Sequence, residues 1–262
     1  MVQNLNVSAG PAPTVVIIPG SFSSAYFYDE IVHQLRMNGF EAAAYDLPSA
    51  SRMPPQPAAT LANDAAFFHD IAQKIADQGK DIVFVTHSYG GVVGTEASKG
   101  LTKAERQADG KEGGLVRLVY LTSVVPSVGN SLADTMGDLV PTYLKVEGEY
   151  MRHDPPEESA KLTFSDLPPE VGVDWVKKMP LHSAPSFAGK LTHPGYKYVP
   201  VSWIFCEDDL ILVPEFQRNC IEMIERESGN KVEVHNLKAG HCPNASVGVE
   251  TAMLITRAIK EA

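Results

Sequence analysis

The feature that most constrains the fold of this chain is a serine, Ser88, between an apolar run and a glycine-rich segment. Residues 82–85 read Ile-Val-Phe-Val, and residues 90–94 read Gly-Gly-Val-Val-Gly. This order predicts a buried strand, a sharp turn and the start of a helix. On such a turn the serine hydroxyl projects above the sheet, and the first N–H groups of the helix face whatever the hydroxyl attacks. The pattern is typical of a nucleophile elbow.

One position departs from the usual G-x-S-x-G pattern of an elbow, because Thr86 stands where the first glycine is expected. A serine in an ordinary strand-to-helix turn is therefore the alternative. A serine nucleophile also needs two partners. A base must remove its proton, and an acid must hold the base in the right tautomer and stabilise its cation.

Both partners follow in the chain, each just beyond an expected strand. Residues 199–206 predict a buried strand, and the acidic run 207–209 comes directly after it. Residues 231–235 alternate as a second strand, and His241 lies in the loop that follows. Serine, acid and histidine would then meet at one edge of the sheet. His235 lies inside the alternating strand, which indicates a partly buried strand residue rather than a catalyst.

Other segments along the chain carry a resemblance to a known family. They read Ile-Ile-Pro-Gly-Ser-Phe at 17–22 with Tyr26 and Phe27 downstream, Tyr-Asp-Leu-Pro at 45–48, Cys-Glu-Asp-Asp at 206–209 and Ala-Gly-His at 239–241. With the elbow, they make nearly the whole chain resemble the α/β-hydrolase superfamily. Within it, the chain is similar to cap-bearing esterases, the plant methylesterases and hydroxynitrile lyases and their fungal and bacterial relatives. The resemblance implies an α/β fold with a mostly parallel central sheet and helices on both faces.

The resemblance also implies roles for individual residues. The family pattern places a glutamine eight positions after the acid, and Gln217 selects Asp209 in this way. Asp208 stays the alternative acid, and otherwise is a loop carboxylate or a cap for the following helix. The oxyanion that forms on attack needs backbone donors, and the N–H groups of Tyr89 and Ser21 are expected to supply them.

The alternation of strands and helices predicts the organisation of the chain. It assigns residues 1–126 and 195–262 to the hydrolase core, with residues 103–114 as an exposed loop. Between 127 and 194 the alternation stops, and the resemblance implies a helical cap there that roofs the site and excludes water. The candidate substrate-binding residues are Gly20, Phe22, Trp175, His182 and Cys242.

Charge and cysteine usage exclude several other classes of protein. The net charge of −10 and the lack of a Lys/Arg stripe argue against nucleic-acid binding. The N-terminal residues carry no leader pattern and no apolar stretch is long enough to cross a membrane, so we expect a soluble, cytoplasmic protein. Three cysteines suggest neither a disulfide framework nor a zinc site. No cofactor or metal is expected.

Together these patterns predict a serine hydrolase that cleaves a carboxylic ester or lactone of a small, largely apolar substrate. Two alternatives stay open, a lyase or cyclase acting on a biosynthetic intermediate and a hydrolase-like ligand receptor. Cyanohydrin cleavage is disfavoured, because Cys242 and Gly20 stand where the resemblance implies a lysine and a threonine in the lyases. The oligomeric state stays open, with a homodimer as one candidate.

Overall fold

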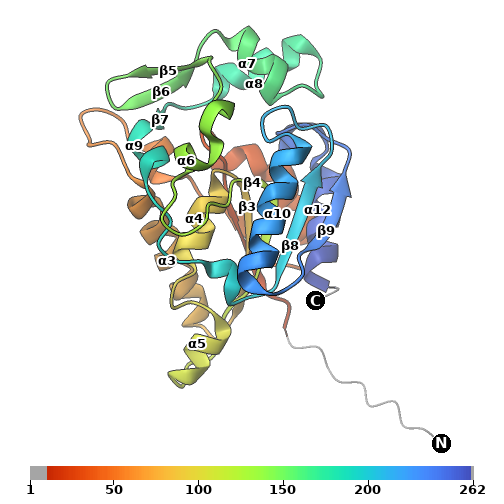
Figure 1. Ribbon diagram of the computed structural model, residues 1–262. Coiled ribbons are helices and arrows are strands. Elements are labelled where there is room, and N and C mark those ends of the chain that lie inside the picture. The colour runs from red at the N-terminus through yellow and green to blue at the C-terminus, as the bar shows by residue number, and fades with distance from the viewer. Residues whose placement is uncertain (1–10, 261–262) are drawn as a thin grey trace, which may run out of the picture.

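A six-stranded parallel sheet forms the centre of the protein (Figure 1). The computed structural model describes residues 11–260. The strand order is β2-β1-β3-β4-β8-β9, and every neighbouring pair is parallel. The strands are β1 (Thr14–Ile18), β2 (Ala42–Ala44), β3 (Asp81–Ser88), β4 (Gly114–Ser123), β8 (Val201–Cys206) and β9 (Glu233–Leu237). The predicted α/β fold with a parallel sheet is confirmed.

Helices cover both faces of this sheet, as the alternation of elements predicts. One face packs against α1 (Asp29–Met37) and α12 (Gly248–Lys260), and the other against α3 (Leu61–Ala76), α4 (Gly90–Ala97) and α10 (Pro214–Ser228). Strand β1 shows the division, because Val16 and Ile18 belong to one core cluster and Val15 and Ile17 to the other. A strand buried on both faces needs a continuous apolar run rather than alternation.

The predicted exposed loop at 103–114 is wrong in its first half. Helix α5 (Lys103–Ala108) begins there, and a reciprocal capping box at its first turn explains why. Thr102 Oγ1 accepts the N–H of Glu105 at 3.2 Å, and the Glu105 carboxylate accepts the N–H of Thr102 at 3.1 Å. The Thr-x-x-Glu spacing at 102–105 was a readable signal for this helix start.

Short elements complete the core and lie in the connections between the long helices and the strands. They are η1 (Ala25–Tyr28), α2 (Pro48–Ser51), η3 (Gly195–Lys197) and α11 (Pro243–Ser246).

Residues 132–188 form a layer of their own at one end of the sheet, at the top of Figure 1. The flanking residues 127–131 and 189–194, which the sequence assigned to this layer, instead run beside the core, where Ser127 bonds Glu227 of α10 and Thr192 bonds Glu96 of α4. The layer's helical pieces are α6 (Leu132–Met136), η2 (Gly137–Leu139), α7 (Pro156–Thr163), α8 (Pro169–Lys178) and α9 (Ala184–Ala188). Its strands are β5 (Leu144–Glu147), β6 (Tyr150–His153) and β7 (His182–Ser183), which form an antiparallel sheet.

The layer is therefore not wholly helical, which corrects the expectation from the sequence. Strands β5 and β6 pair from Glu147 and Tyr150 outward, which leaves a two-residue hairpin loop. Gly148 in this loop has φ of 62°, the positive value that such tight loops favour. A helix cannot continue through this turn.

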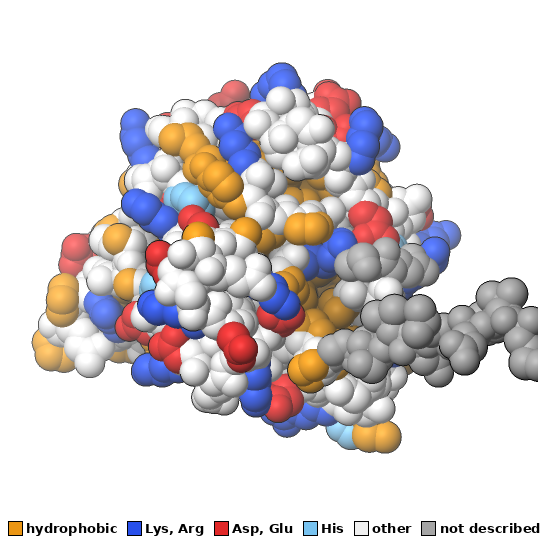
Figure 2. All heavy atoms as spheres, turned by 90° about the horizontal axis from the view of Figure 1, so that it is seen from below, with side chains coloured by type: hydrophobic (Ala, Val, Ile, Leu, Met, Phe, Trp, Pro, Cys, Tyr) orange, Lys and Arg blue, Asp and Glu red, His pale blue; other side chains and the backbone are white. Residues whose placement is uncertain are grey.

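The opposite end of the molecule carries mixed charge. Figure 2 shows that face with lysine, arginine, aspartate and glutamate side chains interspersed rather than gathered into patches of one sign. Within residues 11–260 no helix combines the length and the apolar character that crossing a membrane requires. Residues 1–10, on which the expectation of no leader depends, lie outside the described residues.

Candidate active site

Ser88 ends strand β3 on a sharp turn into α4, with φ of 52°. Positive φ is strained for a residue with a side chain, and functional sites often hold such strain. The turn requires glycine after it. A Cβ at Gly90 would lie 2.4 Å from the carbonyl oxygen of Ile18, and one at Gly91 would lie 2.6 Å from that of Val124. The elbow predicted from the sequence is therefore present.

The same geometry explains how Thr86 replaces the usual glycine of the elbow. The Thr86 methyl group points at α4, and a Cβ at Gly94 would lie 2.5 Å from it. Gly94 thus leaves the space that the Thr86 side chain fills. The close approach of strand and helix therefore depends on a glycine in the helix instead of one in the strand. The Thr86 backbone oxygen also accepts the hydroxyl of Ser123 at 2.6 Å, which ties β3 to β4.

Three residues from distant parts of the chain form one hydrogen-bonded chain. His241 Nε2 lies 3.1 Å from Ser88 Oγ, and His241 Nδ1 lies 2.8 Å from Asp209 Oδ2. Asp208 is exposed, whereas Asp209 is completely buried. The structure therefore selects Asp209 over Asp208 as the partner of His241. This is the geometry of a Ser-His-Asp triad.

Asp209 is buried as a carboxylate with every oxygen occupied. Its Oδ1 accepts the N–H groups of Ile211 and Leu212 at 2.7 and 2.9 Å, and Thr122 donates its hydroxyl to Oδ2 at 2.5 Å. Burial raises the pKa of Asp209, but the facing His241 and these hydrogen bonds outweigh burial and hold that pKa below its ordinary value. An ionised Asp209 can orient His241 and stabilise its cation.

Gln217 holds the loop that carries Asp209, from its buried position on α10. Its amide N–H₂ group donates to the carbonyl oxygens of Cys206 and Leu212 at 2.9 and 2.8 Å. Its Oε1 accepts from the Trp203 indole and from the N–H of Cys206, both at 3.2 Å. The glutamine that marked Asp209 in the sequence thus fixes the two ends of the Asp209 loop.

The predicted oxyanion donors belong to the two loops that flank Ser88. The backbone N–H groups of Ser21 and Tyr89 have no hydrogen-bond acceptor among residues 11–260, and Ser21 lines the cavity above Ser88. Phe22, next to Ser21, has φ of 56°, and its N–H donates to His182 Nδ1 at 3.4 Å. His182 therefore helps to hold the Ser21 loop in an unusual backbone conformation.

A second buried chain, which the sequence did not reveal, joins this loop to His241. The N–H of Gly20 donates to Tyr28 Oη at 3.0 Å, Tyr28 Oη lies 2.7 Å from His87 Nδ1, and His87 Nε2 lies 2.7 Å from the His241 carbonyl oxygen. That carbonyl can only accept, so His87 Nε2 carries a proton and Tyr28 donates to His87 Nδ1. Burial, with repulsion from His241, lowers the pKa of His87 to about 3, so the imidazole stays neutral. The adjacency of His87 to Ser88 was the one available signal.

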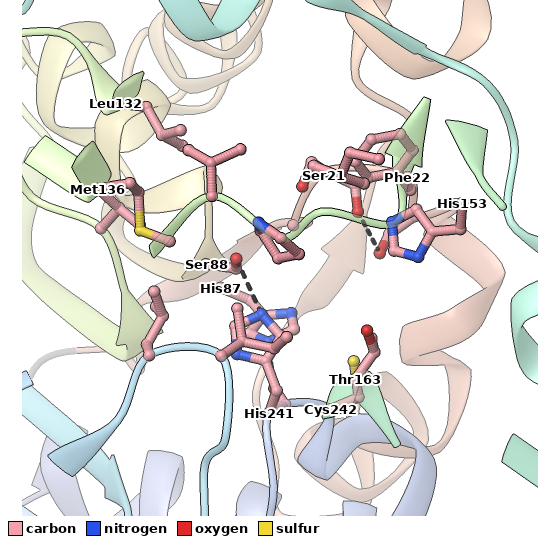
Figure 3. A pocket seen from close by; sticks show the side chains of 18 of the residues that line it. Ser21, Phe22, His87, Ser88, Leu132, Met136, His153, Thr163, His241 and Cys242 are labelled. Atoms are coloured by element: carbon pink, nitrogen blue, oxygen red, sulfur yellow. Dashed lines mark hydrogen bonds between the residues drawn. The ribbon is translucent and has the colours of Figure 1, made fainter. Parts of the chain in front are cut away.

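A cavity of about 70 Å³ lies over Ser88, between the sheet end and residues 132–188 (Figure 3), and it is partly open to solvent. The apolar side chains that line it include Phe22, Val124, Leu132, Met136, Val140, Leu144, Met179, Phe187, Ile211 and Leu212. Its polar lining side chains include those of Ser88, His241, Tyr143, His153 and Thr163. A mostly apolar cavity with a few polar groups is the usual form of a small-molecule site.

Three of the predicted substrate-binding residues line this cavity and two do not. Gly20, Phe22 and Cys242 do. Trp175 instead stacks on Phe164 within the upper layer and meets Phe27, because its large apolar ring is used in packing that layer. His182 is buried behind the cavity wall, where it accepts the N–H of Phe22 and pairs with Ser186.

The remaining histidine and cysteine side chains lie apart from the Ser88–His241–Asp209 chain or line the cavity. His235 lies in β9 with its Nε2 3.2 Å from Glu233, consistent with a strand residue. Across residues 11–260 no three His, Cys, Asp or Glu side chains gather in a way that could hold a metal ion. Cys242 lines the cavity, and burial raises the pKa of its thiol.

The fold and this site define a protein of the α/β-hydrolase class. Residues 15–253 match the Alpha/beta hydrolase family, and the chain belongs to that family. A relative described as "Probable hydrolase R7" of Phoma sp. is 34% identical over 235 residues, covering 90% of this chain and 93% of the relative. "Alpha/beta hydrolase nvfD" of Aspergillus novofumigatus is 29% identical over 255 residues, covering 95% and 98%.

Solved structures of other hydrolases share the fold. A pyrethroid hydrolase from Sphingobium faniae superposes with a TM-score of 0.72 at 18% identity, covering 94% of this chain and 97% of that one. Polyneuridine aldehyde esterase gives 0.70 at 18% identity, covering 94% and 99%. The Arabidopsis methylesterase MES16 gives 0.71 at 17% identity, covering 95% and 100%. At these identities the similarity shows the fold alone.

Proposed function

We propose that this protein is a carboxylic ester hydrolase that cleaves an ester or lactone of a small, largely apolar substrate. The observation that carries the proposal is the hydrogen-bonded chain Ser88–His241–Asp209 at the floor of a mostly apolar cavity. Membership of the Alpha/beta hydrolase family supports the proposal, and esterases are among the proteins that share the fold.

In the proposed reaction His241 removes the proton of Ser88 as Ser88 Oγ attacks the substrate carbonyl. The N–H groups of Ser21 and Tyr89 receive the oxyanion that develops. The C–O bond to the alkoxide then breaks and His241 gives the alkoxide its proton, which leaves an acyl-enzyme; the alcohol departs for an ester and stays on the acyl chain for a lactone. Water, deprotonated by His241, attacks the acyl carbonyl, and His241 passes that proton to Ser88 Oγ as the ester bond to Ser88 breaks and the carboxylic acid is released. Asp209 stays ionised throughout and stabilises the His241 cation.

Cavity chemistry supports hydrolysis over cyanohydrin cleavage. A departing cyanide needs a nearby cation, and the residue after His241 is Cys242, whose thiol stays neutral because burial raises its pKa. Neutral imidazole and hydroxyl groups suffice for acyl transfer to water. No lysine or arginine is among the residues that line the cavity in the described part of the chain.

The test is turnover of short- and medium-chain p-nitrophenyl esters and of a lactone panel, run beside labelling with a fluorophosphonate. We expect Ser88→Ala to lose labelling and to lose at least about a thousandfold in kcat, with its thermal unfolding unchanged. Ser51→Ala, which alters an exposed serine on α2, serves as the matched control and retains both.

Two results would contradict the proposal. One is full turnover by Ser88→Ala, which would place the chemistry elsewhere. The other is a wild-type protein that binds esters and lactones without turning any of them over, which would favour the ligand-receptor alternative.

A further inference from the structure

The roof of the cavity, formed by residues 132–188, contains a polar group that the proposed reaction does not use. His153, the last residue of β6, lines the cavity together with Tyr143 and Thr163. Figure 3 shows its ring at the cavity edge beside Phe22, apart from the Ser88–His241 pair. Most of the remaining roof is apolar, so a histidine there requires an explanation.

His153 ends a chain of hydrogen-bonding side chains within the roof. Its Nδ1 lies 2.5 Å from Ser159 Oγ, Ser159 Oγ lies 3.4 Å from Thr163 Oγ1, and Thr163 Oγ1 lies 3.0 Å from Tyr143 Oη. Ser159 and Thr163 stand four residues apart on α7, so they share one face of that helix. The chain holds the ring by one nitrogen only.

The ring is also fixed by its neighbours. Phe22 meets it edge-on at 4.3 Å between centroids, and Tyr143 packs at 5.1 Å. The other nitrogen, Nε2, hydrogen-bonds to no group among residues 11–260. His153 is half-buried at the edge of the cavity, so a ligand in the cavity can pair with this nitrogen. His153 Nε2 is therefore a preformed hydrogen-bonding point in the cavity.

The charge of the His153 ring decides which ligand group its Nε2 can bind. Burial, with repulsion from His241, lowers the pKa of His153 to about 3, so its ring is neutral at ordinary pH. A neutral ring does not attract a carboxylate or phosphate as a cation would. The hydroxyl groups of Ser159, Thr163 and Tyr143 can each donate or accept. Reversing the direction of the chain changes Nε2 from donor to acceptor, so that either a carbonyl or a hydroxyl is satisfied.

We propose that His153 is a specificity-determining residue that binds a neutral oxygen, a ketone carbonyl or a hydroxyl, carried by the substrate away from its scissile ester. The substrate class is then an oxygenated apolar ester rather than a plain hydrocarbon one. The inference rests on the proposed function for the reaction itself, whereas binding at His153 needs no turnover.

The first arm of the test uses pairs of p-nitrophenyl alkanoates with and without one oxo group, moved along the acyl chain from butanoate to octanoate. For at least one position, wild-type protein should show a kcat/KM about tenfold higher for the oxo ester. Equal kcat/KM within every pair overturns the inference, even if all the esters are hydrolysed.

Two substitutions of His153 test the roles of its two ring nitrogens separately. The amide of His153→Asn can replace Nδ1 at Ser159 but does not extend to Nε2, whereas His153→Gln places an amide near Nε2. We expect Asn to reduce the oxo preference to near unity and Gln to retain part of it. His33→Asn, on the exposed side of α1, is the matched control and keeps the wild-type preference. A full preference in folded His153→Asn contradicts the inference.

A further variant guards against a misfolded roof. Thr163→Val keeps the shape of the side chain and leaves His153 in place, but interrupts the chain to Tyr143. It should lower the oxo preference by a smaller factor, about threefold. If His153→Asn does not fold and Thr163→Val keeps the whole preference, the inference is wrong.

The second arm measures binding without turnover, by calorimetry of ethyl oxoalkanoates and ethyl alkanoates with Ser88→Ala. The oxo ester should bind about tenfold more tightly, and Ser88→Ala combined with His153→Asn should abolish the difference. If wild type hydrolyses nothing but this difference persists, the hydrolase proposal fails and the His153 site stands. If wild type hydrolyses esters and the difference is absent, the reverse holds.

Discussion

The floor and the roof of the cavity are built in different ways. The floor residues Ser88, Asp209 and His241 stand at or just beyond the carboxyl ends of parallel strands, with their hydrogen-bonding atoms paired. The roof, residues 132–188, is assembled from short helices and an antiparallel sheet. It presents one neutral histidine nitrogen that no described residue satisfies. The side chains of the Ser88–His241–Asp209 chain are thus paired with one another, whereas the roof leaves a histidine nitrogen for a ligand to pair.

This difference indicates a division of labour. Strand ends of a parallel sheet lie at fixed spacing, which suits groups that must meet with little tolerance, and ligands of open α/β sheets bind outside these ends. A roof of short elements can change its lining without disturbing the sheet. We therefore expect floor substitutions to slow every ester alike, and roof substitutions to change the ranking of esters.

The largest expected effect comes from the floor acid. Asp209→Asn should lower kcat for all esters by about 10⁴-fold, because an amide favours the wrong His241 tautomer and cannot stabilise its cation. Asp208→Asn makes the same change one residue earlier at an exposed position, and it should leave kcat near the wild-type value. The kcat of the two variants on one ester without an oxo group shows which aspartate is the triad acid. Equal losses in the two variants would contradict the assignment of Asp209.

The positions of the floor residues were largely predictable, because short sequence patterns mark each of them. Apolar runs that end in a serine, an acidic run or a histidine each mark a strand end, and a parallel sheet brings strand ends together. The Tyr28–His87 connection escaped prediction, since Tyr28 reaches His87 across 59 residues and neither position carries a periodic signal. The catalytic roles themselves stay a prediction.

The roof was less predictable because side-chain direction there depends on tertiary packing. Trp175 and His182 were expected in the cavity, yet one packs inside the roof and the other holds the Phe22 N–H from behind. His153, which does line the cavity, was not singled out, because a histidine at the end of a four-residue strand has no distinctive pattern.

An intermediate effect is expected where roof and floor join. Asp166, between α7 and α8, accepts the Gly240 N–H at 2.8 Å and the Ser246 hydroxyl at 2.6 Å, on either side of His241. Asp166→Ala should lower kcat by about tenfold for all esters, because a displaced His241 loses alignment with Ser88. Asp174→Ala, at an exposed position on α8, is the control and should change little. If Asp166→Ala instead alters only the ranking of esters, this residue belongs functionally to the roof.

The smallest effect tests whether the roof histidine is neutral. The pKa of His153 is lowered to about 3 in the folded protein, against about 6.5 for an unfolded histidine. Between these values the unfolded state binds the extra proton, so His153 makes the free energy of unfolding fall as pH falls. The slope is about 1.4 kcal/mol per pH unit for one proton.

Urea unfolding measured between about pH 6 and pH 4 tests this. The slope of the free energy of unfolding against pH should differ between wild type and His153→Asn by the amount expected for close to one proton. His33→Asn, exposed on α1, should match wild type. Parallel slopes for wild type and His153→Asn would mean that the ring is charged, and a charged ring in the roof would select an anionic substrate group instead of a ketone or hydroxyl.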